Sequence, residues 1–207
     1  MNSVSVTGKC WLYKKYDSAF IDYLKNNFSL DEITARLLAI KNIDKKEIQN
    51  YLKPAIKNLL PNPNILKDME KTVSRALLAI ENKEKIGIFG DYDVDGATST
   101  ALLGKYFSEI NCQFEIYIPD RKKEGYGPSI HGFEQLIKKN SNLIFTVDCG
   151  TLSHDPINYA LKKKIDTIVL DHHQSEVKLP KAYSIVNPNR LDDTSNLNYL
   201  CAAGVCF

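Results

Sequence analysis

From residue 86 onward, short apolar runs alternate with longer amphipathic segments. The apolar runs predict strands near residues 86–90, 114–118, 143–147, 165–170 and 183–186. The segments between them predict helices near residues 97–110, 130–140 and 154–163. Strands and helices that alternate in this way are typical of an α/β fold with a doubly wound, mainly parallel sheet.

The pattern before residue 66 contains helix signals but no strand-like runs. Ser29 and Glu32 have the spacing of a capping box, and Asp44 and Glu47 repeat it. Residues 33, 37 and 40 form the apolar stripe of the first of these helices. We therefore expect a small helical N-terminal segment over residues 1–65 and an α/β domain over residues 66–207.

The passage between these two parts contains Pro61 and Pro63, which predict an extended connector. A further helix should follow and lead into the first strand. Its predicted apolar face comprises Met69, Val73, Ala76, Leu77 and Ile80.

Three aspartates, Asp91, Asp93 and Asp95, follow the first predicted strand and are closed by Gly96. Such close carboxylates repel one another, so they indicate either a solvated turn or a bound cation. A calcium-binding EF-hand loop is excluded, because its twelfth position is Leu102 rather than Glu and a strand precedes it instead of a helix.

Two later strand ends carry similar chemistry. Asp148 follows the run at 143–147, and Asp171, His172 and His173 follow the run at 165–170. Parallel strands linked by helices bring their carboxyl ends to one edge, where ligands bind, so these groups should converge. Carboxylates with imidazole suit Mn²⁺ or Mg²⁺, with Zn²⁺ and Fe²⁺ as alternatives.

Three motifs in this order, GDYDVDG, TVDCG and VLDHHQ, resemble the first three motifs of the DHH phosphoesterase superfamily. Within it, the chain is similar to the RecJ-type single-stranded-DNA-specific exonucleases, which also have a loop like IPDRKKEGYGPS at residues 118–129. The resemblance implies a DHH-type catalytic domain and a metal-dependent phosphodiesterase. It further implies 5′-to-3′ digestion of single-stranded DNA in DNA repair and recombination.

The resemblance also implies roles for individual residues around two Mn²⁺ or Mg²⁺ ions. Asp93 and Asp148 would hold the first ion, with Asp91 as an additional ligand or a partner of the ligands. Asp95, Asp148 and His172 would hold the second ion, so that Asp148 bridges the pair. In addition, His173 would touch the scissile phosphate, and Asp171 would orient an imidazole.

Further substrate contacts are expected around this site. Arg121 would bind a DNA phosphate and Tyr126 would stack on a base, although a mobile surface loop is an equally good interpretation of this segment. Gly96 would let the backbone approach closely, and the helix N-terminus at 97–99 would receive an anionic oxygen.

Four other aromatic side chains are interpreted as structural. Trp11 and Tyr13 are predicted packing anchors, and His131 and His154 are expected near helix starts rather than in a site.

Composition says more about the cellular compartment of the protein than about its function. The 207 residues carry a formal net charge of +2, and the lysine pairs are typical of solvated helix faces, so charge alone does not indicate nucleic-acid binding. Five cysteines without paired metal-ligand spacing favour reduced thiols. No run reaches the length of a membrane helix and no signal peptide is recognised, so we expect a cytoplasmic protein.

Longer members of the superfamily have a fourth aspartate motif and a separate substrate-binding domain, and the RecJ branch adds an OB-type module. We therefore expect a DHH-type domain truncated before its fourth motif, weak or inactive alone, whose partners are single-stranded DNA, the missing C-terminal domains and DNA-repair proteins. Two alternatives stay open: a phosphodiesterase of short oligonucleotides or cyclic dinucleotides, and an inactive metal-binding fragment.

Overall fold

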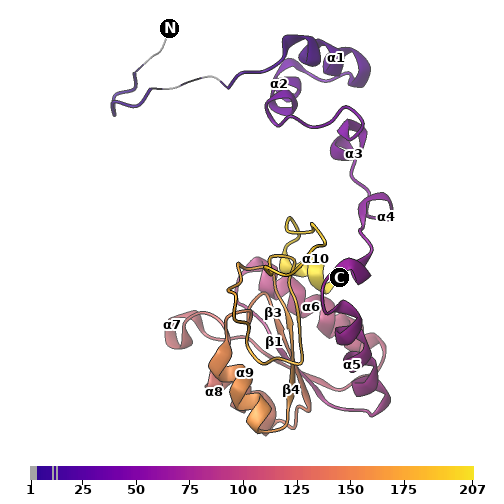
Figure 1. The fold of residues 1–207 in the computed structure, drawn as a ribbon, viewed down its shortest axis with the longest axis vertical. Coiled ribbons are helices and arrows are strands. Elements are labelled where there is room, and N and C mark those ends of the chain that lie inside the picture. The colour runs from indigo at the N-terminus through magenta and orange to yellow at the C-terminus, as the bar shows by residue number, and fades with distance from the viewer. Residues whose placement is uncertain (1–3, 11, 13) are drawn as a thin grey trace. The chain divides into compact units, whose positions relative to one another are not determined.

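The structure is a computed structural model that describes residues 4–10, 12 and 14–207. The chain forms two compact units, residues 1–61 and 62–207 (Figure 1). Trp11 and Tyr13, the predicted packing anchors, lie outside the described residues. The boundary between the units falls at Pro61, and the division of functional domains at residue 65 stays a prediction.

The second unit is built on a five-stranded sheet in which every neighbouring pair of strands is parallel. The strand order is β2-β1-β3-β4-β5. The bounds are Ile86–Phe89 for β1, Phe114–Tyr117 for β2, Leu143–Val147 for β3, Asp166–Leu170 for β4 and Ser184–Val186 for β5. The predicted α/β class and all five predicted strands are confirmed.

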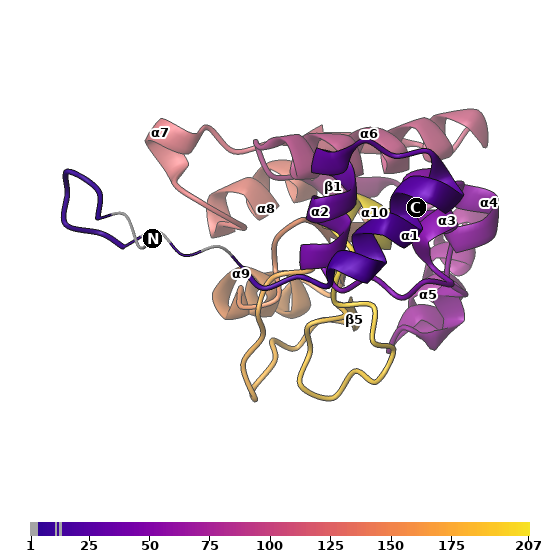
Figure 2. The same ribbon diagram turned by 90° about the horizontal axis from the view of Figure 1, so that it is seen from above.

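Helices cover both faces of this sheet (Figures 1 and 2). One face packs against α5 (Met69–Glu81), α6 (Val94–Glu109) and α10 (Ala202–Cys206), and the other against α8 (Ile130–Lys138) and α9 (His154–Lys162). The short helix α7 (Arg121–Glu124) lies in the loop after β2. The sheet is therefore doubly wound, as the alternation of strands and helices predicted.

Burial on both faces explains why the central strand β3 is a largely apolar run. In β3, Leu143 and Phe145 face the α5–α6 side, whereas Ile144 faces the α8–α9 side. All five residues of β3 are buried. Successive side chains of a strand point to opposite faces, so a strand covered on both sides requires apolar residues at every position.

The predicted apolar face of α5 is wrong in part. Val73 and Leu77 are 44% and 50% exposed, whereas Thr72 and Arg75 are buried. Arg75 donates to Asp166 at 2.6 Å and to Glu84 at 2.8 Å, and the hydroxyls of Thr72 and Ser184 are 2.7 Å apart. These polar contacts orient α5 against the edge of the sheet, which hydrophobic periodicity cannot indicate.

The first unit contains α1 (Ser18–Phe28), α2 (Glu32–Ile40), α3 (Ile48–Leu52) and α4 (Ile56–Leu59). The predicted capping box is wrong, because Asp31 caps α2 and Ser29, with a φ of 53°, ends α1. Its core consists of Ile21, Leu24, Ala35, Leu38, Ala39 and Ile48.

The predicted stripe of α2 points mainly outward. Ile33 is 72% exposed and Leu37 is 56% exposed, because α2 packs its alanine-containing face against α1. Asp44 accepts from the Lys46 N–H in a turn, and α3 begins only at Ile48. The predicted extended connector around Pro61 and Pro63 begins where α4 ends, and it contains a 3₁₀ turn, Pro63–Ile65.

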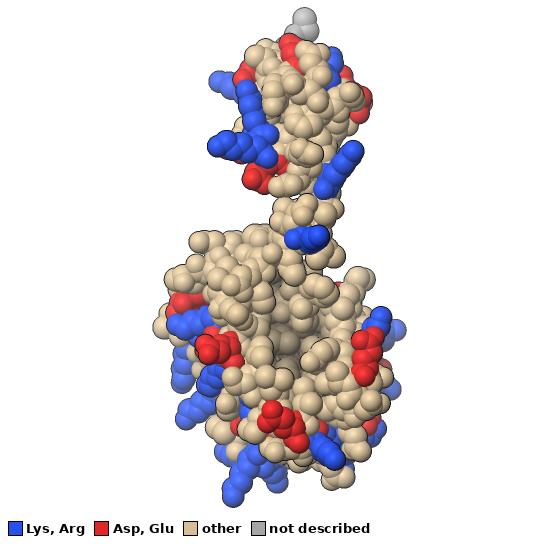
Figure 3. All heavy atoms as spheres, turned by 90° about the vertical axis from the view of Figure 1, so that its right-hand side faces the viewer, with Lys and Arg blue, Asp and Glu red and all other residues tan. Residues whose placement is uncertain are grey.

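The surface of residues 62–207 carries mixed charges. On the face shown in Figure 3, basic and acidic side chains are interspersed around a hollow lined mainly by uncharged residues. Among the described residues, no helix is long and apolar enough to cross a membrane.

Candidate metal centre

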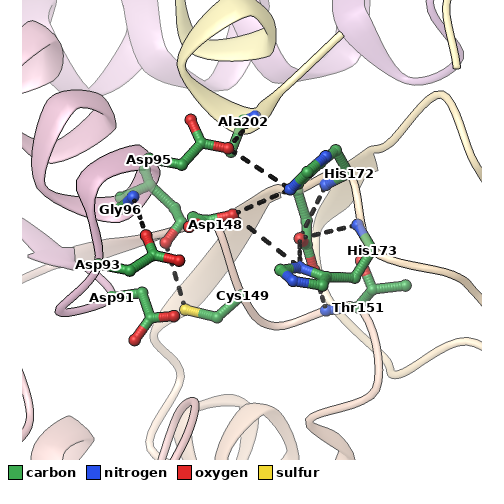
Figure 4. A network of polar contacts seen from close by, with 12 residues as sticks. Asp91, Asp93, Asp95, Gly96, Asp148, Cys149, Thr151, His172, His173 and Ala202 are labelled. Carbon is green, nitrogen blue, oxygen red and sulfur yellow. Dashed lines mark hydrogen bonds and ion pairs between the residues drawn. The ribbon is translucent and has the colours of Figure 1, made fainter. Parts of the chain in front are cut away.

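The predicted site residues meet at the carboxyl ends of the three adjacent strands β1, β3 and β4 (Figure 4). The turn from β1 to α6 carries three aspartates, Asp148 directly follows β3, and Asp171, His172 and His173 directly follow β4. Because β3 lies between β1 and β4, Asp148 lies at the centre of the group. The parallel topology therefore brings together residues that are far apart in the sequence.

The turn after β1 is fixed by the start of α6. Asp93 caps this helix, since its Oδ1 accepts from the Gly96 N–H at 2.9 Å, and this hydrogen bond lowers the pKa of Asp93. Asp91 is buried, and burial raises its pKa. A Cβ on Gly96 would lie 2.5 Å from the Cβ of Asp91, so only glycine allows this close approach.

The predicted anion site at residues 97–99 is wrong. The helix begins at Val94, three residues earlier than expected, so these residues lie inside its first turns. The N–H of Ala97 donates to the carbonyl oxygen of Asp93 at 2.9 Å and is not available to a ligand.

Asp148 is the least satisfied polar residue of the site. It is 1% exposed, and neither carboxylate oxygen has a hydrogen-bond partner among the described residues. Burial, together with the nearby Asp95 and Asp93, raises its pKa to about 8. A buried carboxylate without hydrogen bonds is costly to ionise unless a cation compensates it, so this residue fits a metal ligand.

Two sets of side chains place their ligand atoms within 4.8 Å of one another. They are Asp91, Asp93 and Asp148 in one set, and Asp148, His172 and His173 in the other. Asp148 belongs to both. Carboxylate oxygens with imidazole nitrogens suit Mn²⁺ and related divalent ions, so the donor chemistry fits the expected metal.

Asp95 lies at the margin of the second set. Its Oδ2 is 3.4 Å from Nε2 of His172, which is also 3.3 Å from Oδ1 of Asp148. The two Asp95 oxygens accept from the backbone N–H groups of Ala202 and Ala203, each at 2.8 Å. Asp95 therefore connects the site to the start of α10, a contact that the sequence did not indicate.

Asp171 has partners for both of its oxygens. Its Oδ2 accepts from the Thr151 N–H at 3.0 Å, and its Oδ1 lies 2.8 Å from Nδ1 of His173 and accepts from the N–H of His172 at 2.7 Å. Burial raises the pKa of Asp171, but the bonds from His173 and Thr151 outweigh it and hold this pKa at about 2. The same contact with Asp171 raises the pKa of His173.

Tyr126 approaches the site through its hydroxyl group. The oxygen lies 3.2 Å from Nε2 of His173 and 3.3 Å from the carbonyl oxygen of Asp148, while 57% of the residue stays exposed. Burial of the hydroxyl and the nearby Asp171 raise the pKa of Tyr126. Tyr126 is thus placed to contact both His173 and solvent.

Arg121 lies at the rim, with its guanidinium carbon 5.2 Å from the centre of the Tyr92 ring. Tyr92 belongs to the aspartate-rich turn but was not singled out from the sequence. His131 and His154 lie in the first turns of α8 and α9, as expected, and neither belongs to the two ligand sets.

Sequence reasoning also missed Thr151, Asn187 and Asn189. Thr151 and Asn187 are buried, and both contact the loops that carry the site. The available signal was the Asn-Pro-Asn segment that directly follows β5, since asparagine beside proline marks a turn fixed by side-chain hydrogen bonds.

The fold and the site define a class, an α/β protein with carboxylate and histidine groups that could hold a metal at the carboxyl edge of a parallel sheet. A family model described as "DHH family, N-terminal domain" matches residues 85–207. The chain belongs to the DHH family.

Similar proteins extend this result to nearly the whole chain. The single-stranded-DNA-specific exonuclease RecJ of Bacillus subtilis (strain 168) is 32% identical over 197 residues, which are 95% of this chain and 25% of that protein. RecJ of Escherichia coli (strain K12) is 36% identical over 86% of this chain and 30% of its own length. The chain thus spans about a quarter to a third of these relatives.

Solved structures agree with the fold. A crystal structure of exonuclease RecJ bound to manganese matches with a TM-score of 0.62 and 30% identity, over 68% of this chain and 36% of that chain. RecJ of Thermus thermophilus in complex with Mn²⁺ matches with a TM-score of 0.67 over 91% of this chain and 26% of that chain, and at 24% identity it supports the fold alone.

Proposed function

We propose that this chain is the catalytic portion of a single-stranded-DNA-specific exonuclease that hydrolyses phosphodiester bonds with Mn²⁺ or Mg²⁺. Similarity to RecJ proteins over most of the chain supports the reaction class. The observation that carries the proposal is Asp148, which is buried, accepts no hydrogen bond from the described residues and is shared by both sets of ligand atoms.

The donor sets suggest which residues would hold the ions. Asp91, Asp93 and Asp148 would hold one, whereas Asp148 and His172, with Asp95 beside them, would hold the other. When bound, a divalent pair supplies a water of lowered pKa and neutralises the charge of the phosphate.

The remaining side chains would act on the substrate. Asp171 holds Nδ1 of His173, which leaves Nε2 toward the Tyr126 hydroxyl and the open side of the site. The contact with Asp171 raises the pKa of His173 and so favours the protonated ring, whose Nε2–H would donate a hydrogen bond to a phosphate oxygen. Arg121 would add a cation at the rim, where it lies over Tyr92.

Several finer points of this proposal come from the resemblance of the motifs to RecJ-type exonucleases and not from the geometry. They are digestion in the 5′-to-3′ direction, a role in DNA repair and recombination, a cytoplasmic location, and the partners single-stranded DNA, DNA-repair proteins and further C-terminal domains. The mixed charge on the face in Figure 3 adds no independent support for DNA, so the substrate class rests on sequence similarity.

The test compares the wild-type chain with Asp148→Asn and with Asp155→Asn, a matched control on an exposed residue of α9. We expect Mn²⁺ binding by titration calorimetry, and Mn²⁺-dependent release of nucleotides from end-labelled single-stranded DNA, in the wild type and the control only. Equal activity of Asp148→Asn would contradict the proposal. Faster cleavage of cyclic dinucleotides would favour the small-substrate alternative, and Mn²⁺ binding without any hydrolysis would favour an inactive metal-binding unit.

A further inference from the structure

The backbone of the histidine pair is held by two asparagines from a distant turn. Nδ2 of Asn187 donates to the carbonyl oxygen of His173 at 2.9 Å, and Nδ2 of Asn189 donates to the carbonyl oxygen of His172. Both asparagines follow β5, which pairs with β4 at the edge of the sheet. The turn after one strand therefore positions the two residues that follow its neighbour.

Asn187 is fully buried and uses its whole amide group. Nδ2 also donates to Oγ1 of Thr151 at 2.8 Å, and Oδ1 accepts from the N–H of Asn189 at 2.8 Å. A buried amide that lacks such partners costs free energy, so these contacts restrict the side chain to one orientation. Asn187 thereby links the loops after β3, β4 and β5.

A second path connects the same loops through Asp171. Thr151, which Asn187 contacts, donates its N–H to Oδ2 of Asp171 at 3.0 Å. Oδ1 of Asp171 lies 2.8 Å from Nδ1 of His173. The backbone of His173 is thus fixed by Asn187 and its ring by Asp171, and both paths meet at Thr151.

The turn itself has an anchor that does not involve the asparagine side chains. Nη1 of Arg190 donates to the carbonyl oxygen of Ile185 at 2.6 Å and to Oδ2 of Asp68 at 2.7 Å, and the guanidinium also pairs with Asp192. Arg190 is itself largely buried, with 9% of the residue exposed. These contacts should keep the turn in place when an asparagine amide is changed.

We propose that Asn187, assisted by Asn189, is a positioning residue that sets the direction of the two imidazoles toward Asp148. The inference rests on the proposed function for its effect on metal binding, because the histidines complete the second set of ligand atoms. Groups that hold metal ligands in place typically change metal affinity by about 10- to 100-fold when they are replaced.

The experiment uses Asn187→Asp, which keeps the shape but replaces the donor NH₂ with an oxygen facing the His173 carbonyl. Asn189→Ala is a milder second variant that removes only the contact with His172. The matched controls are Asn158→Asp and Asn158→Ala, on α9 and away from the ligand sets. Each variant is first checked for folding by circular dichroism and thermal unfolding.

Two readouts then follow at one fixed pH. The ring ¹⁵N resonances of the four histidines are recorded without metal, and Mn²⁺ affinity is measured by electron paramagnetic resonance. We expect the His173 resonances to move in Asn187→Asp and those of His172 in Asn189→Ala, with His131 and His154 unchanged. Mn²⁺ affinity should fall about tenfold or more in Asn187→Asp.

The outcomes separate this inference from the proposed function. Folded variants with wild-type histidine resonances and wild-type Mn²⁺ affinity would overturn the positioning role. If Asn187→Asp does not fold, the His172 resonances and the Mn²⁺ affinity of Asn189→Ala provide the test, and wild-type values of both would overturn the inference. A wild-type chain that binds no Mn²⁺ would contradict the proposed function, while the resonances would still test the positioning of the rings.

Discussion

Two aspartates, one after β3 and one after β4, are equally buried, but their pKa values are shifted in opposite directions. Asp148 and Asp171 are each 1% exposed. Asp148 has no hydrogen-bond partner for either oxygen among the described residues and a pKa raised to about 8, whereas Asp171 has partners for both oxygens and a pKa of about 2. The exposed fraction is the same, so the neighbouring groups decide the charge state: Asp95 and Asp93 raise the pKa of Asp148, whereas hydrogen bonds from His173 and Thr151 lower that of Asp171.

Asp148 therefore has oxygens free to bind a ligand, whereas the oxygens of Asp171 already accept hydrogen bonds within the protein. Asp148 also has a φ of 60°, a left-handed conformation that costs a non-glycine residue about 1 kcal/mol or more. Unpaired oxygens and backbone strain at one position are typical of functional sites. Asp171, in contrast, stabilises the loops that carry the histidines.

The largest effect is expected when Asp148 is replaced. Asp148→Asn should reduce Mn²⁺-dependent hydrolysis at least about 10³-fold, because both sets of ligand atoms lose their shared carboxylate. In a chelator, the same variant should be as stable as the wild type or more stable at pH 8, since it removes a buried carboxyl group that is costly to ionise there. Activity assays and urea unfolding measure the two effects, and loss of stability without loss of activity would contradict this view.

Asp171→Asn should reduce stability, which Asp148→Asn should not. We expect it to lower the free energy of unfolding by about 2–4 kcal/mol, because the hydrogen bonds lose the buried charge and the amide NH₂ replaces the acceptor of one N–H group, that of His172 or that of Thr151. Urea unfolding at neutral pH in a chelator measures the change. A variant as stable as the wild type would show that the hydrogen bonds to Asp171 do not stabilise the fold.

The two aspartates should also give opposite pH dependence in the metal-free protein. Asp148 has a raised pKa, so its contribution is complete below its unfolded pKa near 4 and is lost as the pH rises toward 8, at up to about 1.4 kcal/mol per pH unit. Asp171 has a lowered pKa, so its contribution is present above about pH 4 and is lost as the pH falls toward 2.

Unfolding free energies of the wild type and of Asp148→Asn, measured in a chelator from about pH 5 to 8, isolate the Asp148 part. The difference between them should grow with pH in favour of the variant. A constant difference would mean that Asp148 is ionised throughout this range.

The smallest expected effect concerns Tyr126, whose hydroxyl contacts both strand ends. Tyr126→Phe removes the contacts with Nε2 of His173 and with the Asp148 carbonyl but keeps the ring. We expect a three- to tenfold loss of hydrolysis, about 1 kcal/mol, with little change in thermal stability. Tyr92→Phe, which keeps the ring beneath Arg121, is the control. Unchanged hydrolysis and DNA binding in Tyr126→Phe would contradict a role of the hydroxyl and leave base stacking by the ring, which the variant retains.

Much of the second unit was predictable because its strands are apolar on both sides. The run at 143–147 could form only a covered strand, and its end had to place Asp148 at the ligand-binding edge. The helix faces were harder to predict. Val73 and Leu77 of α5 are exposed because Arg75 and Thr72 make specific partners across the sheet edge, and pairing between distant residues leaves no local pattern.

The site was likewise only partly predictable from the sequence. The acidic and imidazole groups were found from their position at strand ends, yet the contacts of Asp95 with α10 and of Asn187 with His173 were not. Asn187 lies 14 positions from His173, and Asp95 lies 107 positions from Ala202. Such contacts depend on how loops of different strands meet in space.

The amino-acid sequence by itself determined the parallel α/β class and the set of groups that could bind a metal, because hydrophobic periodicity and residue type act locally along the chain. Only the tertiary structure decided which of two equally buried aspartates is left unpaired. Hydrogen bonds and backbone conformation at the strand ends set the charge of each carboxylate, and those depend on residues that only folding brings together.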